Sequence, residues 1–493
     1  MVHMIQTVQP VGPYRIAGWS FGGVLAFEIA AQLIGADQEV EFLGVFDTRY
    51  SASIADSCAS LKEAFEEKEA LLDLVQRVTS DTRMQQTTID ELKSTATAID
   101  FSDLFHKCHE LGLVPEPFLN LTDQQLQHTL ALNHAYRLAS LRYYAQQIPI
   151  PLHLFLAHDA VVTDSLLGWD AVMPKRLIRV VSIQGKHQSM TSRSDVKALG
   201  KAVSNSIHNP TKQLDQLPEH DYSPLVPLQV GRSHMYPFFC VPGAGSSVTA
   251  FVDLITHLPP EWTFFGLQPR GLDGALVPYS TVEVAATAYL RAIREICTKG
   301  PIHLIGHSFG GWVAFEIAQR LPTEELTVAS LTILDSEAPD DESDVREYSN
   351  TDAIMKWLDV VELTLERPLN VRRIDLDSRK ENLQRALLHR RLVDEGLLPR
   401  SSQPEILRGL LRTFNMSLRT KYTPDKVYPG PVRLVLVENH KLDRNGNKQL
   451  RDQLIEKWKR WAPNVTSVQV PGNHITVLKP PHVRALANLI RQM

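Results

Sequence analysis

The sequence has few cysteines, no long apolar run and no long basic run. Four cysteines are scattered over 493 residues with no Cys-x-x-Cys spacing. This pattern argues against a disulfide framework or a structural zinc site and predicts a reducing, cytoplasmic setting. No run reaches the roughly 18 apolar residues that a transmembrane helix needs, so we expect no membrane partner. Residues 1–10 lack the basic and apolar segments of a signal peptide.

The charge balance excludes a further class of partner. Lys and Arg total 51 and Asp and Glu total 56, which gives a formal net charge of −5. A weakly acidic chain without a basic stretch lacks the electrostatic footprint of a nucleic-acid binder. Hydrophobic residues make up 43% of the chain, so a normal globular core is expected, and the length predicts two or three domains.

The chain contains an internal duplication. Residues 18–33 (GWSFGGVLAFEIAAQL) and 306–321 (GHSFGGWVAFEIAQRL) are identical at eleven of sixteen positions. Apolar runs downstream end in Asp47 and Asp335 and keep the same offset of 288 residues. This offset is far longer than a solenoid repeat, so the pattern indicates a duplicated domain.

The two copies predict two domains, residues 1–207 and 222–493, joined by a linker at 208–221. The second copy has a strand-like run at 237–241 and a PGAG loop at 242–245 before its GHSFGG segment, whereas only 19 residues precede Ser20 in the first. We therefore expect the first domain to lack its initial strands and to be truncated at its N-terminus. We therefore expect one of three origins: a fragment of a longer protein, a misassigned start, or a truncated gene.

Both copies alternate short apolar strands with amphipathic helices. Apolar strands of this kind suit a parallel sheet covered on both faces, and the alternation predicts an α/β fold with a mostly parallel sheet. Residues 48–145 and 336–423 interrupt this alternation with helix-favouring sequence. We expect each of these stretches to form a helical lid over the ends of the strands.

Each copy carries a G-x-S-x-G motif between an apolar strand and an apolar helix, at 18–22 and 306–310. The glycines permit a tight turn that projects the serine hydroxyl, and the helix N-terminus behind it favours developing negative charge. One such motif is weak evidence because Gly and Ser are common in turns. Two copies in the same context indicate nucleophilic serines at Ser20 and Ser308.

A serine hydroxyl needs a base, and the base needs an orienting acid. The α/β-hydrolase order is Ser, then Asp or Glu, then His. The acid follows the serine by 27 residues in both copies, and the histidine follows it by 166 and 167 residues. The predicted triads are Ser308, Asp335 and His474 in the second copy, and Ser20, Asp47 and His187 in the first. Asp159 is an alternative acid, but Asn439 stands at its place in the second copy.

The oxyanion hole of such a site needs two backbone N–H donors. One is the amide after the nucleophile, Phe309 or Phe21, and the other comes from a loop after an early strand. The second copy offers Gly243 or Ala244, whereas the first copy has no such loop. The loss of one donor costs on the order of 3 kcal/mol of transition-state stabilisation. We therefore expect the first copy to be a poor catalyst even though its triad side chains are present.

Residues beside the motif have simpler interpretations. His307 precedes the nucleophile, and Trp19 takes its place in the first copy, so we interpret His307 as a packing residue rather than a base. Glu28 and Glu316 lie in the helix after each motif, where structural pairing is a better interpretation than catalysis.

Together these segments resemble the terminal thioesterase domains of nonribosomal peptide synthetases, here in tandem. The segments that carry the resemblance are the two GxSFGG elbows with their AFEIA helices, Leu334-Asp335, FCVPGAG at 239–245, GLQPRGLDG at 266–274, GNH at 472–474 and PPHV at 480–483. The resemblance covers residues 222–493 and most of 1–200. It implies two α/β-hydrolase domains, a peptide or acyl thioester on the phosphopantetheine arm of a carrier domain as substrate, and no metal or redox cofactor.

In that family the serine forms an acyl-enzyme that is released by water or by an amine or hydroxyl of the same chain, which closes a ring. Carried over, Ser308 is the nucleophile, His474 the base and Asp335 its orienting acid. The implied partner is an acyl or peptidyl carrier protein or an upstream synthetase module. Two alternatives remain: a general carboxylesterase or lipase on the same fold, and one active thioesterase with a non-catalytic docking domain at residues 1–207.

Overall fold

The computed structural model describes most of the chain, with short gaps. The described residues are 1–50, 65–78, 83–114, 118–157, 166–184, 187, 190, 196–208, 222–232, 236–321, 326–339, 348–365, 367–377, 381–438 and 442–492. Almost all of the linker expected at 208–221 lies outside them, as do Asp159 and Asn439. Below, residues 1–207 are called the first half and 222–493 the second half; these boundaries stay a prediction.

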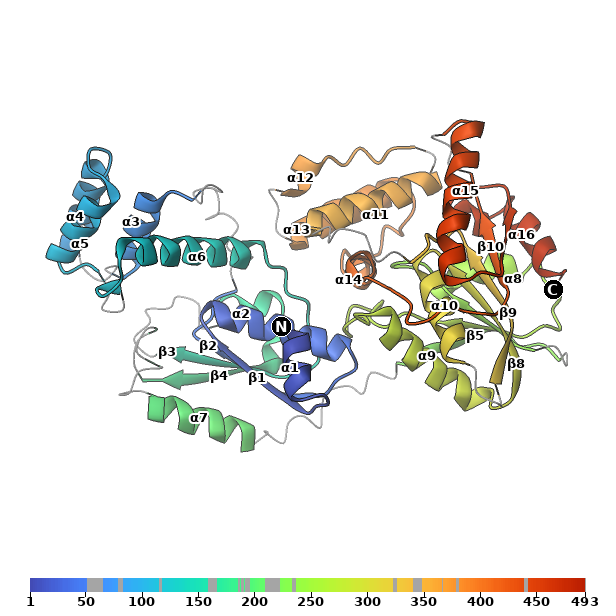
Figure 1. Cartoon of the computed structure of the whole chain (residues 1–493), viewed down its shortest axis with the longest axis horizontal. Helices are drawn as coiled ribbons and strands as arrows, with labels where there is room; N and C mark the ends of the chain where they lie inside the picture. Colours follow the sequence, from blue (N-terminus) through green and yellow to red (C-terminus); the bar gives the residue numbers. More distant parts are fainter. Residues whose placement is uncertain are drawn as a thin grey trace.

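The first half is built on a parallel four-stranded sheet in the order β1-β2-β3-β4 (Figure 1). Its strands are β1 (Tyr14–Trp19), β2 (Val40–Phe46), β3 (Leu152–Ala157) and β4 (Ile178–Ile183). Consecutive strand residues point to opposite faces. Leu43 and Leu154 pack with α2 (Phe21–Gly35) in one core, while Phe42 and Phe155 pack with α7 (Val196–His208) in another. Helices therefore cover both faces, as a buried parallel sheet requires.

The second half has a seven-stranded sheet in the order β11-β10-β9-β8-β6-β7-β5. All its pairings are parallel except that of β5 with β7. The strands are β5 (Leu225–Gln229), β6 (Phe238–Val241), β7 (Phe264–Leu267), β8 (Gly300–His307), β9 (Leu326–Leu334), β10 (Val432–Leu436) and β11 (Val465–Gln469). The α/β fold with mostly parallel sheets is thus confirmed.

Two groups of helices sandwich this second sheet. One core joins it to α9 (Val282–Ile296), α10 (Phe309–Arg320) and α15 (Arg444–Trp461), with Phe315 and Trp458 fully buried. The other joins it to α8 (Val252–Ile255) and α16 (Val483–Ile490). The apolar strand residues alternate between the two cores.

The duplicated strands occupy different places in the two sheets. β1, β2, β3 and β4 correspond in order to β8, β9, β10 and β11, and α2 corresponds to α10. β8 lies between β9 and β6, but β1 is an edge strand. Within the described residues, the first sheet has no counterpart of β5, β6 or β7.

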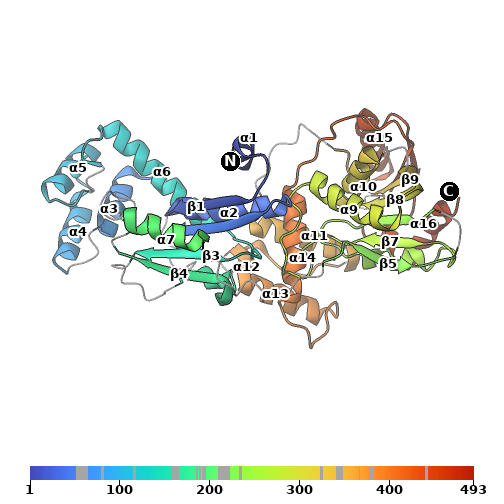
Figure 2. The ribbon, with the colours of Figure 1, turned by 90° about the horizontal axis from the view of Figure 1, so that it is seen from below.

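Helices occupy both stretches that the sequence assigns to lids. The first half has α3 (Glu67–Val78), α4 (Arg83–Thr95), α5 (Phe101–Glu110) and α6 (Asp123–Arg142), and the second has α11 (Asn350–Leu365), α12 (Arg373–Asp377), α13 (Glu381–Asp394) and α14 (Ile406–Arg419). Each set has its own apolar core. Figures 1 and 2 place α14 between the first half and the second sheet. Among the described residues, no helix is long and apolar enough to cross a membrane.

Candidate active site

Both serines sit in the strained turn that the motif predicts. Ser308 has φ 54° and ψ −127°, and Ser20 has φ 55° and ψ −126°. A positive φ is costly for a residue with a side chain and persists only where the surrounding structure enforces it. At Gly306 an added Cβ would lie 2.3 Å from the carbonyl oxygen of Gly310, so only glycine fits. The turn thus holds the Ser308 hydroxyl at the C-terminal end of β8.

The second triad is joined by two hydrogen bonds. His474 Nδ1 lies 2.7 Å from Asp335 Oδ2, and His474 Nε2 lies 3.0 Å from Ser308 Oγ. Asp335 follows β9, and its N–H donates to the carbonyl oxygen of Val435 over 2.8 Å. Because the carboxylate accepts from Nδ1–H, Nε2 is left to accept the serine proton. This arrangement is that of a nucleophile, a base and an orienting acid.

Asn473 fixes the loop that carries His474. Its Oδ1 accepts from the backbone N–H groups of Ile475 and Thr476 at 3.0 and 2.9 Å. Its Nδ2 donates to the carbonyl oxygen of Leu363, on the lid helix α11, over 3.2 Å. This role of Asn473 was not predicted, and the only sign of it in the sequence is its place directly before His474.

The first triad is only partly connected. His187 Nδ1 lies 2.6 Å from Asp47 Oδ2, and the Asp47 N–H donates to the carbonyl oxygen of Phe155 over 2.7 Å. Ser20 and His187 are both described, and no hydrogen bond joins their side chains. The acid and the histidine therefore meet as predicted, but the nucleophile and the histidine do not.

Backbone donors surround the Ser308 hydroxyl. A Cβ added to Gly243 would lie 3.2 Å from Ser308 Cβ, so the PGAG loop lies against the nucleophile. Within the described part of the chain, the amides of Gly243, Ala244 and Phe309 donate no hydrogen bond. Phe309 opens α10, where the helix dipole favours an anion. The amides that the sequence predicts as oxyanion donors are thus available.

The same position in the first half has no packing partner among the described residues. A Cβ added to Gly310 would lie 2.3 Å from the carbonyl oxygen of Val241 and 2.5 Å from that of Pro242, where β6 runs into the PGAG loop. A Cβ added to Gly22 would meet nothing within 4 Å. Phe21 opens α2 as Phe309 opens α10, but no described loop lies opposite it to supply the second donor.

A small cavity adjoins the second site, between the PGAG loop and the lid. Its volume is about 30 Å³, and its wall includes Gly243, Phe309, Pro269, Tyr279 and Thr413. Thr413, on α14, is buried, and its hydroxyl has no hydrogen-bond partner among the residues that the structure describes. A ligand group that enters here meets a wall of mixed character, in which Arg270 and the Thr413 hydroxyl stand among apolar side chains.

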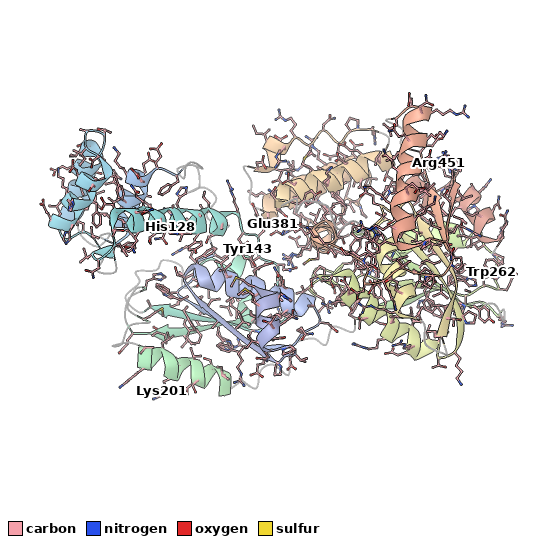
Figure 3. All side chains as sticks on the ribbon, viewed as in Figure 1. His128, Tyr143, Lys201, Trp262, Glu381 and Arg451 are labelled. Carbon is pink, nitrogen blue, oxygen red and sulfur yellow. The ribbon has the colours of Figure 1, made fainter. Side chains whose placement is uncertain are left out.

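Glu28 and Glu316 make structural pairs, as the sequence predicts. Tyr422 donates to Glu316 Oε2 over 2.7 Å, and Tyr143 donates to Glu28 Oε2 over the same distance. Figure 3 shows Tyr143 where α6 ends, beside α2. Burial and the adjoining carboxylate raise the pKa of both tyrosines above the usual range. These tyrosines were not predicted, although they stand at similar places, Tyr143 shortly before β3 and Tyr422 shortly before the corresponding strand β10.

The described residues contain no group of three or more His, Cys, Asp or Glu side chains placed to hold a metal ion.

The chain is similar to known thioesterase domains along most of its length. The family model described as Thioesterase domain matches residues 1–187 and 236–493. The Vlm2 thioesterase domain, a solved structure, is 23% identical, with a TM-score of 0.41 over 54% of this chain and 96% of that domain.

The similar curated proteins are large synthetases. Malpibaldin synthetase of Mortierella alpina is 37% identical over 120 residues, which are 24% of this chain and 2% of the synthetase. A protein described as an inactive atromentin synthetase of Paxillus involutus is 24% identical over 331 residues, 64% of this chain and 33% of that protein. The chain thus spans a third or less of the length of these relatives.

Proposed function

The chain belongs to the thioesterase domain family, and from this premise we propose that its second half releases a carrier-bound peptidyl or acyl thioester in nonribosomal peptide biosynthesis or related polyketide biosynthesis. The observation that carries the proposal is the connected triad, with 2.7 Å between His474 and Asp335 and 3.0 Å between His474 and Ser308. The family match supports thioester chemistry over the carboxylesterase or lipase alternative.

In the proposed mechanism Ser308 Oγ attacks the thioester carbonyl while His474 Nε2 takes the hydroxyl proton. Asp335 holds the imidazole in the required tautomer and stabilises its positive charge. The tetrahedral intermediate collapses, the C–S bond breaks, and the imidazolium returns the proton to the departing thiolate. The products of this half-reaction are an acyl-serine and the free pantetheine thiol.

Release repeats these steps with a different nucleophile. Water, or an amine or hydroxyl of the same acyl chain, gives up a proton to His474 and attacks the ester carbonyl. Water yields a free acid, and an internal nucleophile yields a ring. The lid helices α11 and α14 lie close to the His474 loop and the PGAG loop respectively, so they are placed to influence how much water reaches the ester.

The oxyanion is held in this proposal by the Phe309 amide together with the Gly243 or Ala244 amide. All three are free of internal hydrogen bonds within the described residues, which suits preorganised donors. The proposed reaction uses no metal or redox cofactor, because side chains and amides supply every proton transfer and charge contact it needs.

The proposed partner is an acyl or peptidyl carrier protein or an upstream synthetase module. The printed names of the similar curated proteins, which are synthetases, support it. Cys108, Cys240 and Cys297 are free thiols, which fits a reducing cytoplasm.

We further propose that the first half of this chain does not catalyse the reaction and serves a docking or structural role. Two observations favour this alternative over two equal enzymes. Ser20 is not hydrogen-bonded to His187, and no described residue packs beside Gly22 in the way that the Val241 and Pro242 backbone packs on Gly310. The first site therefore has neither an activated nucleophile nor a second oxyanion donor among the described residues.

Fluorophosphonate labelling read by intact mass tests the assignment of the nucleophile. We expect one adduct on the wild type, retained in Ser20→Ala and lost in Ser308→Ala. Two adducts would show that the first triad also assembles, and no adduct on the folded protein would overturn the serine mechanism. Turnover of an acyl-pantetheine thioester against the oxoester of the same acyl group then separates a thioesterase, which favours the thioester, from a general esterase.

A further inference from the structure

The residue before each nucleophile makes the same contact in both halves. His307 ends β8, and its Nε2 lies 2.7 Å from the carbonyl oxygen of His474. Trp19 ends β1, and its Nε1–H donates to the carbonyl oxygen of His187 over 3.1 Å. Two different side chains therefore bind the main-chain oxygen of the histidine that pairs with the acid.

The ring planes also match. The Trp19 and His187 rings stack with centroids 5.1 Å apart, and the His307 and His474 rings lie 5.0 Å apart at an angle of 36°. Each ring thus holds its histidine both through the carbonyl oxygen and through contact with the imidazole.

The shared chemistry of the two rings is hydrogen-bond donation. An indole N–H can only donate, and a carbonyl oxygen can only accept. His307 must therefore carry its hydrogen on Nε2, which leaves Nδ1 without one. Burial lowers the pKa of His307 to about 4, so the ring is neutral at pH 7 and keeps this tautomer. The feature that His307 shares with Trp19 is therefore a donated N–H, which an indole can supply, and not proton abstraction, which an indole cannot perform.

His307 also touches the other side of the site. A Cβ added to Gly243 would lie 3.2 Å from His307 Nδ1. The ring is buried between the PGAG loop, which offers the oxyanion amides, and the loop that carries His474. It therefore sits between the two loops whose spacing the reaction depends on.

We propose that the residue before the nucleophile is a positioning residue, whose ring N–H fixes the backbone of the triad histidine through its carbonyl oxygen. The inference rests on the proposed function of the second half. The hydrogen bond that His307 makes goes to the His474 backbone, whereas the Ser308 hydroxyl is bonded to the His474 ring, so His307 acts through His474. A shift of about 1 Å in a catalytic group is enough to cost a large factor in rate, so an anchor on the main chain of His474 acts on kcat.

The test is a matched pair of substitutions in the full chain. His307→Gln places an amide N–H where Nε2 lies, and His307→Met has a similar length without a donor. We expect His307→Met to lower kcat for an acyl-pantetheine thioester about tenfold, in line with the loss of one hydrogen bond, with KM within about twofold. We expect His307→Gln to keep kcat within about threefold of the wild type.

Thermal unfolding checks that both variants fold, and His307→Ala replaces the methionine variant if that variant does not. The inference is overturned if the donor-free variant keeps the wild-type kcat, or if the glutamine variant loses as much as the donor-free one. If His307 had a purely structural role, both variants would lose kcat equally, and the loss would follow the decrease in Tm. Failure of the proposed function looks different, because the wild type then shows no thioesterase turnover that depends on Ser308.

Discussion

Arg270, in the second half, donates from Nη2 to the carbonyl oxygen of Ile34, in the last turn of α2, over 2.9 Å. Its Nη1 also donates to Asp37 Oδ1 over 3.0 Å, and its guanidinium lies 4.0 Å from the centre of the Tyr279 ring. Helix C-termini leave carbonyl oxygens unpaired, and a cation there interacts favourably with the helix dipole. Arg270 lines the cavity beside Gly243 as well. The helix that begins at the first nucleophile thus ends against the wall of the second site.

Replacement of Arg270 tests whether this contact holds the halves together. We expect Arg270→Met to lower the free energy of unfolding by about 1–3 kcal/mol, because hydrogen bonds from a charged donor are lost while the apolar stem is kept. Denaturant titration measures the change. Arg291 is the matched control, since its side chain is 67% exposed and lies 4.0 Å from Asp37. We expect Arg291→Met to change stability by less than about 0.5 kcal/mol. Equal effects of the two substitutions would show that the contacts of Arg270 stabilise the fold no more than the exposed ion pair of Arg291 does.

The paired glycines after the two serines give a second test. Gly310→Ala forces a Cβ to within 2.3 Å of the Val241 carbonyl oxygen, so the PGAG loop must move. We expect a loss of about 1–3 kcal/mol of stability and a lower rate of fluorophosphonate labelling at Ser308. In Gly22→Ala the added Cβ meets no described atom within 4 Å, and we expect a gain in stability of up to about 1 kcal/mol, since alanine is the better helix former.

Denaturant titration of the two alanine variants measures both changes in the free energy of unfolding, the expected loss in Gly310→Ala and the expected gain in Gly22→Ala. A loss of stability in Gly22→Ala similar to that in Gly310→Ala would mean that some part of the chain does pack beside Gly22. That result would remove one of the two grounds for treating the first half as non-catalytic.

The elbow turns and the pairing of each acid with its histidine could be predicted because the chemistry requires particular residue types at strand ends. A duplicated motif shows its spacing twice, so Asp335 and His474 stand out from other acids and histidines. The lids followed from the interruption of the strand–helix alternation. Tyr143 and Tyr422 were missed because a buried tyrosine–glutamate pair joins segments over 100 residues apart with no local pattern.

The difference between the two triads could not be read from the sequence. Ser20, Asp47 and His187 have the right types and spacing, but a hydrogen bond between nucleophile and base depends on loop placement within about 1 Å. The contact of His307 was also hidden, because its partner is a carbonyl oxygen, and every residue has one. The interpretation of His307 as a packing residue identified its burial but not its donor role.

Two buried histidines make stability depend on pH in a predictable direction. Burial lowers the pKa of both His303 and His307 to about 4, whereas the unfolded chain titrates near the usual value of about 6.5. Between these values the unfolded chain binds more protons, so the free energy of unfolding decreases as the pH falls from about 6.5 towards 4. Each histidine adds a slope of about 1.4 kcal/mol per pH unit in the middle of that range.

His307→Gln isolates the contribution of one ring. Denaturant titrations at pH 7, 6 and 5 give the slope, and we expect the variant to be shallower than the wild type by close to one proton, about 1.4 kcal/mol per pH unit. His303 still titrates in the variant, so part of the slope remains. Exposed His3 is the control, and His3→Gln is expected to leave the slope unchanged. An unchanged slope in His307→Gln would mean that His307 takes up a proton in the folded protein, and a charged ring would not be the neutral Nε2–H donor to His474 that the geometry requires.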